Sequence, residues 1–276
     1  MLANTFIHMP GIGPATEKKL WQSNINAWTD KDRLSRTNLS CAKAKAIEAY
    51  ADQSIQHLKN NNPNFFENLL PSSQHFRLFP EFRQSCAYLD IETTGLNASA
   101  RITTIAIYDG REIKYFVQGK NLSDFLDHIQ EYKVLITYNG RCFDIPFIEN
   151  YFHVRLPHCQ IDLRYILQYL GFKGGLKKCE KAMGIDREDL DGVDGYFAVL
   201  LWENYIRTGN TKALDTLLAY NIEDVINLEG MMVQAYNLHI EHTPFFRSHK
   251  IQTPLKPKNP LKADKQTIQS IKRQYY

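Results

Sequence analysis

Between residues 86 and 137, the apolar positions fall into short runs that are typical of strands. Three consecutive runs are rich in β-branched residues, and Asp109-Gly110, a strong hairpin-turn signal, joins the second run to the third. A segment with apolar residues at helical spacing follows, and a fourth run then returns to the strand pattern. We therefore expect three strands, a helix and another strand, at residues 87–91, 102–107, 113–117, 125–129 and 134–137.

After Asp162 the apolar residues recur almost entirely at helical spacing. This spacing predicts helices over residues 165–169, 176–183 and 196–206, and from 212 to about 238. Strands followed by helices that pack on them form an α/β domain.

These patterns divide the chain into four parts. We expect a small all-helical module around a glycine turn at residues 1–50 and a connector at residues 51–85. The α/β domain is expected at residues 86–242, and a basic tail at residues 243–276. The tail carries prolines among its lysines and has little apolar surface to bury, so we expect it to be extended or loosely attached.

Charge is distributed unevenly along the chain. The formal net charge is +3, but residues 244–276 hold eight lysine and arginine residues against Asp264 alone, which gives the tail +7 and leaves −4 for the rest. An acidic body with a basic extension is compatible with a polyanion-binding protein that concentrates carboxylates in one place. It is equally compatible with an ordinary solvated tail.

The composition excludes several classes of protein. With 276 residues, 43% of them hydrophobic and 23% charged, the chain is neither collagen-like, nor a coiled coil, nor wholly disordered. No apolar run approaches the ~18 residues of a membrane span, and the first residues lack an export signal. The five cysteines form no Cys-x-x-Cys pair. We therefore expect a cytoplasmic protein without membrane association.

Two carboxylates lie at the end of the first predicted strand. Because side chains alternate along a strand, Asp90 and Glu92 face the same side of the sheet. A divalent cation would supply the counter-charge that two like charges need. A solvated strand end is the alternative, but the apolar surroundings and the small turn at residues 93–95 favour a buried site.

A third carboxylate follows the strand at residues 134–137. Asn139-Gly140 predicts a turn, and Asp144 falls at the start of the next helix. An aspartate in that place commonly caps the helix. The loop nevertheless leaves the carboxyl end of a strand, where open α/β sheets build their sites.

A fourth carboxylate lies on the long helix predicted after residue 212. Tyr220 and Asp224 are four residues apart and therefore share one face of that helix. Asp224 is interleaved with the apolar stripe that docks the helix, and such an acid is costly to bury unless it is paired or bound to a metal. Glu223 points elsewhere, and we expect it at the surface.

Three pairs of residues resemble, in order and spacing, the three exonuclease motifs of the DEDD superfamily: Asp90 with Glu92, Asp144 after Asn139, and Tyr220 with Asp224. The tyrosine four residues before the last aspartate is typical of the tyrosine-type branch. Residues 77–82 and 218–228 are similar to the YprB-type ribonuclease-H-like domain, and this resemblance covers roughly residues 74–240. It implies a ribonuclease-H-like mixed sheet flanked by helices.

The resemblance implies a metal-dependent 3′→5′ exonuclease that hydrolyses phosphodiester bonds at single-stranded or frayed nucleic-acid ends. Two divalent cations, Mg²⁺ or Mn²⁺, would be its cofactors. Asp90 would bridge both ions, Glu92 and Asp224 would complete the first site, and Asp144 would hold the second. Tyr220 would orient the attacking water, because a phenol with a pKa near 10 is a poor base at neutral pH.

Two further residues are candidates for contacting the substrate: Thr93, whose backbone would seat the terminal 3′-hydroxyl, and Asn139. Two other functions stay open, namely a nucleic-acid-binding or scaffolding protein that has lost turnover, and an endonuclease with the same metal site. The choice between DNA and RNA depends on groups around the 2′-position of the terminal sugar, and the sequence does not place them.

Residues 7–20 resemble a helix-hairpin-helix motif. In that motif the glycines, here Gly11 and Gly13, expose backbone N–H groups that bind a phosphate without contacting bases, and Lys18 and Lys19 add positive charge. A glycine turn between packed helices, or a contact with another protein, is the alternative. Only one copy is present, whereas DNA-binding examples commonly use two.

Overall fold

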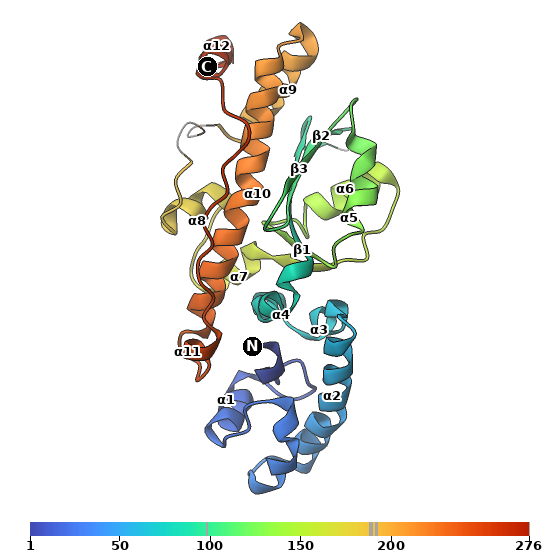
Figure 1. Ribbon diagram of the computed structural model, residues 1–276, viewed down its shortest axis with the longest axis vertical. Helices are drawn as coiled ribbons and strands as arrows, with labels where there is room; N and C mark the ends of the chain where they lie inside the picture. Colours follow the sequence, from blue (N-terminus) through green and yellow to red (C-terminus); the bar gives the residue numbers. More distant parts are fainter. Residues whose placement is uncertain (98, 188–189, 191–192, 276) are drawn as a thin grey trace.

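The computed structural model describes residues 1–275 except 98, 188–189 and 191–192, and a five-stranded mixed sheet lies at its centre (Figure 1). The strand order is β3-β2-β1-β4-β5. β1 pairs antiparallel with β2, which pairs antiparallel with β3, whereas β4 and β5 continue the sheet in parallel. The bounds of the strands are β1 Cys86–Thr93, β2 Ile102–Tyr108, β3 Ile113–Val117, β4 Val134–Thr137 and β5 Cys159–Asp162.

The four strands expected from the apolar runs are confirmed, as is the Asp109-Gly110 turn between β2 and β3. That turn is closed by the Asp109 side chain, which accepts the N–H groups of Arg111 and Glu112, and Gly110 adopts a φ of +89°. β1 continues to Thr93, and the register against β2 shifts between Glu92 and Thr93. Such a shift re-aims the strand end next to the carboxylates.

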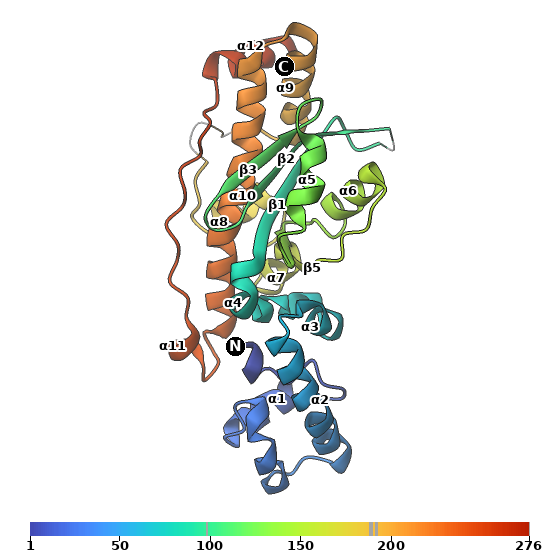
Figure 2. The same cartoon turned by 45° about the vertical axis from the view of Figure 1, so that its right-hand side comes forward.

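Helices cover both faces of the sheet (Figures 1 and 2). α10 (Thr211–Ile240) crosses one face, and α5 (Phe125–Ile129) with α6 (Asp144–Phe152) covers the other. Leu89 and Ile91 belong to the hydrophobic core on the α5 and α6 side. Since side chains alternate, Asp90 and Glu92 are directed to the α10 side.

The helical part after Asp162 also matches the sequence pattern. It consists of α7 (Leu163–Tyr169), α8 (Leu176–Ala182), α9 (Gly195–Thr208) and α10, and α9 packs beside α10. Among the residues that the structure describes, no helix is both long and apolar enough to cross a bilayer.

The first part of the chain is helical and lies beyond the Cys86 end of β1 (Figure 1). Its α-helices are α1 (Pro14–Gln22), α2 (Cys41–Lys59), α3 (Pro63–Leu69) and α4 (Phe79–Phe82), and its 3₁₀ segments are Leu2–Asn4, Trp28–Arg36, Ser72–Leu78 and Arg83–Ser85. The expected boundary at residue 50 falls inside α2. Only one 3₁₀ turn precedes the glycine turn, so the first helix of the expected helix-hairpin-helix is reduced to that turn.

The tail was expected to be extended or loosely attached: it is extended between α11 (Phe246–His249) and α12 (Lys265–Tyr275), but it is not loosely attached. After α11, the chain runs in extended form back along α10 and ends in α12, as Figure 2 shows. Hydrogen bonds join Asn237 to Ile251, Asn259 to the carbonyl of Ala219, and the Asp264 N–H to Thr216. Ile268 and Ile271 are buried against α9 and α10. These few apolar residues are enough to hold the tail.

Candidate active site

Three of the predicted carboxylates converge between β1 and α10. One oxygen from each of Asp90, Glu92 and Asp224 lies within 4.8 Å of the others. Glu92 and Asp224 are buried and Asp90 is half-buried. The period of two in β1 and the docking of α10 on the same face bring these acids together, although Asp224 is more than 130 residues from the other two in sequence.

Asp144 is a fourth acid beside this group of three. It is the first residue of α6, whose N-cap residue is Phe143, so the alternative in which Asp144 is the N-cap residue does not hold. The Asp144 carboxylate instead accepts the backbone N–H of Ile91 at 3.1 Å. Ile91 lies between Asp90 and Glu92, so this bond fixes Asp144 against the strand that carries the other acids.

The Asp90 side chain is held by α10. Asn221 donates from Nδ2 to the Asp90 carboxylate at 2.7 Å and to its backbone carbonyl at 3.2 Å. Thr104 of β2 donates to the Asn221 carbonyl at 2.9 Å. Both Asn221 and Thr104 are fully buried, so the amide is locked in one orientation. Neither residue was identified from the sequence, where Asn221 is only the residue after Tyr220.

The four carboxyl groups resist ionising together. Burial, followed by the charge of Asp224 and of the other acids, raises the pKa values of Asp90 and Glu92 well above their usual range. Burial raises the pKa of Asp144 to about 7 and that of Asp224 to about 6, with the Arg187 charge opposing the shift at Asp224. A bound cation would remove this repulsion, and an all-oxygen donor set suits Mg²⁺ or Mn²⁺.

Tyr220 lies one helical turn before Asp224 and is buried. Its ring is flanked by two cations: the Lys177 ammonium is 4.6 Å from the ring centroid and the Arg187 guanidinium carbon is 5.7 Å from it. Burial, and then the charges of Asp224 and Glu92, raise the pKa of the Tyr220 hydroxyl further above its usual value. The phenol therefore stays protonated and can donate a hydrogen bond at neutral pH.

Arg187 is a site residue that sequence reasoning missed. Glu180 of α8 holds it from two sides, with Nε to Oε2 at 2.5 Å and Nη2 to Oε1 at 2.8 Å, while Nη1 forms an ion pair with Asp224. Asn227 donates to Glu180 at 2.9 Å. Arg187 stands in an irregular segment without periodicity, so the sequence carries no pattern that would have identified it.

Thr93 and Asn139, the two candidates for contacting the substrate, both make hydrogen bonds within or between loops. Thr93 is buried, and its hydroxyl donates to the Gly95 carbonyl at 2.7 Å. Asn139 adopts a φ of +67°, its N–H donates to Asp162 at 2.8 Å, and its side-chain oxygen accepts from Arg164. Asp162 also accepts the Arg164 N–H and thereby caps α7. Asn139 therefore shapes the loop that delivers Asp144.

The glycine hairpin lies apart from the carboxylates, beyond the opposite end of β1 (Figure 1). Gly11 adopts a φ of +75°, and Gly13 is the N-cap residue of α1. An added Cβ at either glycine would meet open space, so neither is required for close packing. The positive φ of Gly11 favours glycine there, whereas Gly13 has extended backbone that any residue adopts. Lys18 and Lys19 are exposed on α1, and a cavity of about 420 Å³ is lined by residues 7–13 with Asn68 and Leu69.

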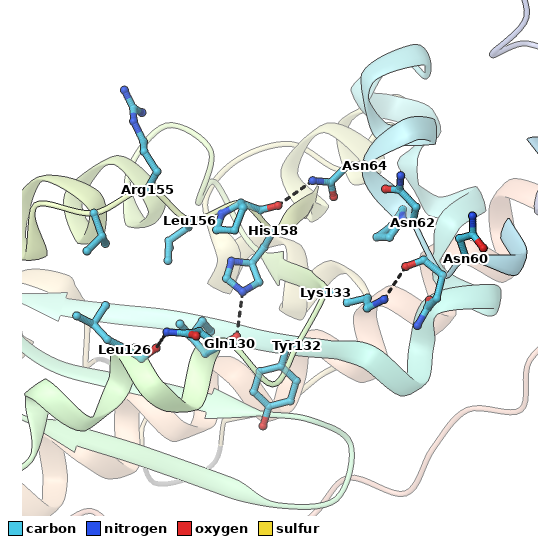
Figure 3. Close-up of a pocket in the computed structure, with 15 residues that line it drawn as sticks. Asn60, Asn62, Asn64, Leu126, Gln130, Tyr132, Lys133, Arg155, Leu156 and His158 are labelled. Carbon is cyan, nitrogen blue, oxygen red and sulfur yellow. Dashed lines mark hydrogen bonds between the residues drawn. The ribbon is translucent and has the colours of Figure 1, made fainter. Parts of the chain in front are cut away.

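A cavity of about 870 Å³ lies elsewhere, between the connector and the sheet domain (Figure 3). Lys133 and His158, which directly precede β4 and β5, line it together with residues 60–64. Lys133 donates to the Asn61 carbonyl at 2.9 Å, and Asn64 donates to the Pro157 carbonyl at 2.7 Å. Because Asp144 follows the other end of β4, this cavity is not part of the carboxylate cluster.

A protein-family model agrees with this architecture. Residues 87–236, more than half of the chain, match the family model RNase_H_2, described as RNase_H superfamily. Seven solved chains match, among them the family B DNA polymerase from the hyperthermophilic archaeon Pyrobaculum calidifontis, at 13% identity and a TM-score of 0.39. That alignment covers 56% of this chain and 29% of the polymerase. No curated protein matches.

Proposed function

The chain belongs to the RNase H superfamily, and from that premise we propose that it is a metal-dependent 3′→5′ exonuclease acting on single-stranded or frayed nucleic-acid ends. The observation that supports the proposal is the cluster of Asp90, Glu92 and Asp224, whose ligand oxygens lie within 4.8 Å of one another. Carboxylates that are forced together by the fold, at a cost in their ionisation, are typical of a cation site.

The donor atoms fit two Mg²⁺ or Mn²⁺ ions. Asp90, Glu92 and Asp224 would hold the first ion, and Asp144, which is fixed to the Ile91 N–H, would hold the second together with Asp90. When bound, the ions activate water and neutralise the leaving 3′-oxygen. The hydrogen bond from Asn221 holds the Asp90 carboxylate in its orientation toward the site.

Tyr220 positions the attacking water. Its hydroxyl stays protonated because burial and the surrounding carboxylates raise its pKa, so it acts as a hydrogen-bond donor rather than as a base. The glycine hairpin with Lys18 and Lys19 would bind the phosphate backbone of a longer strand away from the reacting end.

A digestion time course tests the proposal. Strands of DNA and of RNA, labelled at the 5′ end, are incubated with Mn²⁺ or Mg²⁺, beside the Asp90→Ala variant and an EDTA control. We expect products that shorten progressively from the 3′ end, with no products in either control. A strand that is blocked by a 3′-phosphate should resist digestion. Internal cleavage of the blocked strand would identify an endonuclease instead.

A nucleic-acid-binding protein without turnover is the second candidate, and the ion pair between Arg187 and Asp224 favours it. This pair already neutralises one of the carboxylates that the first ion needs. A Mn²⁺ titration separates the two functions. Binding of two ions per chain supports the exonuclease, whereas strand binding without ion binding supports the second candidate.

A further inference from the structure

Lys177 is a half-buried residue with a buried ammonium whose function the carboxylate site does not explain. It stands in the first turn of α8, and its Nζ atom is shielded from solvent. Within the described part of the chain, Nζ has no hydrogen-bond partner, and it lies 4.6 Å from the centroid of the Tyr220 ring. A desolvated ammonium with three unused donors is costly unless a ligand satisfies it.

The other cation of the site differs from Lys177. Arg187 donates hydrogen bonds from Nε and Nη2 to Glu180, and its Nη1 forms an ion pair with Asp224. Its charge is therefore matched by direct contacts, whereas Lys177 only experiences the charges of Asp224 and Glu92 through space. Lys177 is thus the cation of the site that remains available to an anion.

We propose that the Lys177 ammonium binds a non-bridging oxygen of the scissile phosphate. Lys177 contacts the Tyr220 ring, Tyr220 lies one turn from Asp224 on α10, and the charges of Asp224 and Glu92 act on Lys177. A phosphate bound at the carboxylates would therefore lie near the Lys177 donors. Lysine suits this task, because its ammonium is a compact charge with donors that rotate. The assignment rests on the proposed function, since the anion it names is the phosphodiester substrate.

Two variants at neighbouring positions form the test. Lys177→Gln removes the buried charge, and Lys178→Gln removes an exposed charge at the next position of α8, so both proteins carry the same net charge. The probe is thymidine 5′-monophosphate, titrated calorimetrically in Mn²⁺. Lys177→Arg shows whether a positive charge rescues binding.

We expect Lys177→Gln to raise the Kd of the nucleotide and the KM for a labelled strand about 10–100-fold, as for a lost charged hydrogen bond. Lys178→Gln should stay within about twofold of the unchanged protein, and Lys177→Arg should recover most of the affinity.

Three other outcomes are informative. An unchanged Kd in Lys177→Gln, with a lowered Tm, would show that Lys177 only holds α8 on the Tyr220 ring, and would overturn the inference. Failure of the unchanged protein to bind the nucleotide would overturn it as well. Nucleotide binding that needs Lys177, in a protein that digests no strand, would overturn the proposed function and leave the phosphate subsite standing.

Discussion

Asn221 donates a 2.7 Å hydrogen bond to the Asp90 carboxylate from the helical turn between Tyr220 and Asp224. The same helix therefore supplies one carboxylate and orients another that belongs to the sheet. Thr104 donates to the side-chain carbonyl of Asn221 and so supports the orientation in which the amide NH₂ group faces Asp90. The geometry of the site consequently depends on a strand, β2, that contributes no acid.

Removing this support should weaken metal binding without removing a carboxylate. We expect Asn221→Leu to lower the affinity for Mn²⁺ about 10–100-fold, measured by calorimetry, as is usual when a residue behind a ligand is lost. Thr104→Val should cause a smaller loss. Thr103→Val is the matched control, because the Thr103 hydroxyl is also buried but has no hydrogen-bond partner; an equal loss in that variant would contradict the assignment.

Tyr220→Phe should slow strand digestion by about 10²–10⁴-fold while metal affinity stays unchanged. The reason is that only the hydroxyl, and with it the orientation of the water, is lost, whereas the ring that contacts Lys177 remains. Single-turnover rates at saturating Mn²⁺ measure the effect. A rate equal to that of the unchanged protein would remove Tyr220 from the mechanism.

Without metal, the stability of the protein should fall as the pH rises. The pKa values of Asp144 and Asp224 are raised to about 7 and about 6, above the unfolded value of 3.8. The stability that these protonated groups contribute is complete below about pH 4 and is lost as the pH rises through 6 and 7.

Thermal unfolding of the unchanged protein and of Asp90→Asn in EDTA, at pH 5 and pH 8, tests this expectation. Asp90→Asn removes one of the carboxylates that repel one another. The Tm of this variant should therefore exceed that of the unchanged protein, and by more at pH 8 than at pH 5. Mn²⁺ should raise the Tm of the unchanged protein mainly at pH 8, since binding requires deprotonated carboxylates. A Tm difference between the two proteins that is independent of pH would refute the idea that ionisation of the carboxylates lowers stability.

The buried ion pair between Glu17 and Arg77 should be important for stability. It joins α1 to the Ser72–Leu78 segment at 2.9 Å, with both side chains largely shielded from water. Arg77→Met leaves Glu17 buried and unpaired, so we expect a loss of about 3–5 kcal/mol in urea unfolding. Lys31→Met breaks the exposed pair with Asp52 and should cost no more than about 1 kcal/mol. Similar losses would contradict this ranking.

The hairpin can be tested by charge reversal instead of deletion, because the module shares its hydrophobic core with α10. Lys18→Glu together with Lys19→Glu should weaken the binding of long strands and leave the hydrolysis of short oligonucleotides nearly unchanged. Fluorescence anisotropy at two salt concentrations measures the binding. Equal losses on long and short substrates would argue against a role in tethering.

The sequence was sufficient where function depends on local periodicity. Alternation along β1 places Asp90 and Glu92 on one face, and helical spacing places Tyr220 with Asp224. That these segments meet in one cluster was implied by the resemblance to the three exonuclease motifs, and the structure brings Asp90, Glu92 and Asp224 together. Asp144 was proposed because its loop leaves the carboxyl end of a strand and because it fits the motif resemblance. The hydrogen bond from the Ile91 N–H that fixes it joins two distant segments, so the sequence could not reveal it.

The missed features depend on contacts between distant segments. Lys177 lies on α8 and Arg187 in the segment after it, and no spacing rule connects these segments to α10. Glu223 was expected at the surface, but it is buried beneath the tail, where Lys256 forms an ion pair with it and Asn259 donates to it. The composition of the tail does not reveal a partner that lies more than 30 residues earlier.

The path of residues 251–264 along α10 has a consequence for the order of folding. The ribosome synthesises α10 before the segment that covers it, so the nascent helix emerges with Glu223, the neighbour of Asp224, still open to water. Only after translation has passed Asn259 can this side of the helix close. The covering of this side of α10 is therefore completed by a part of the chain that contributes no carboxylate to the site.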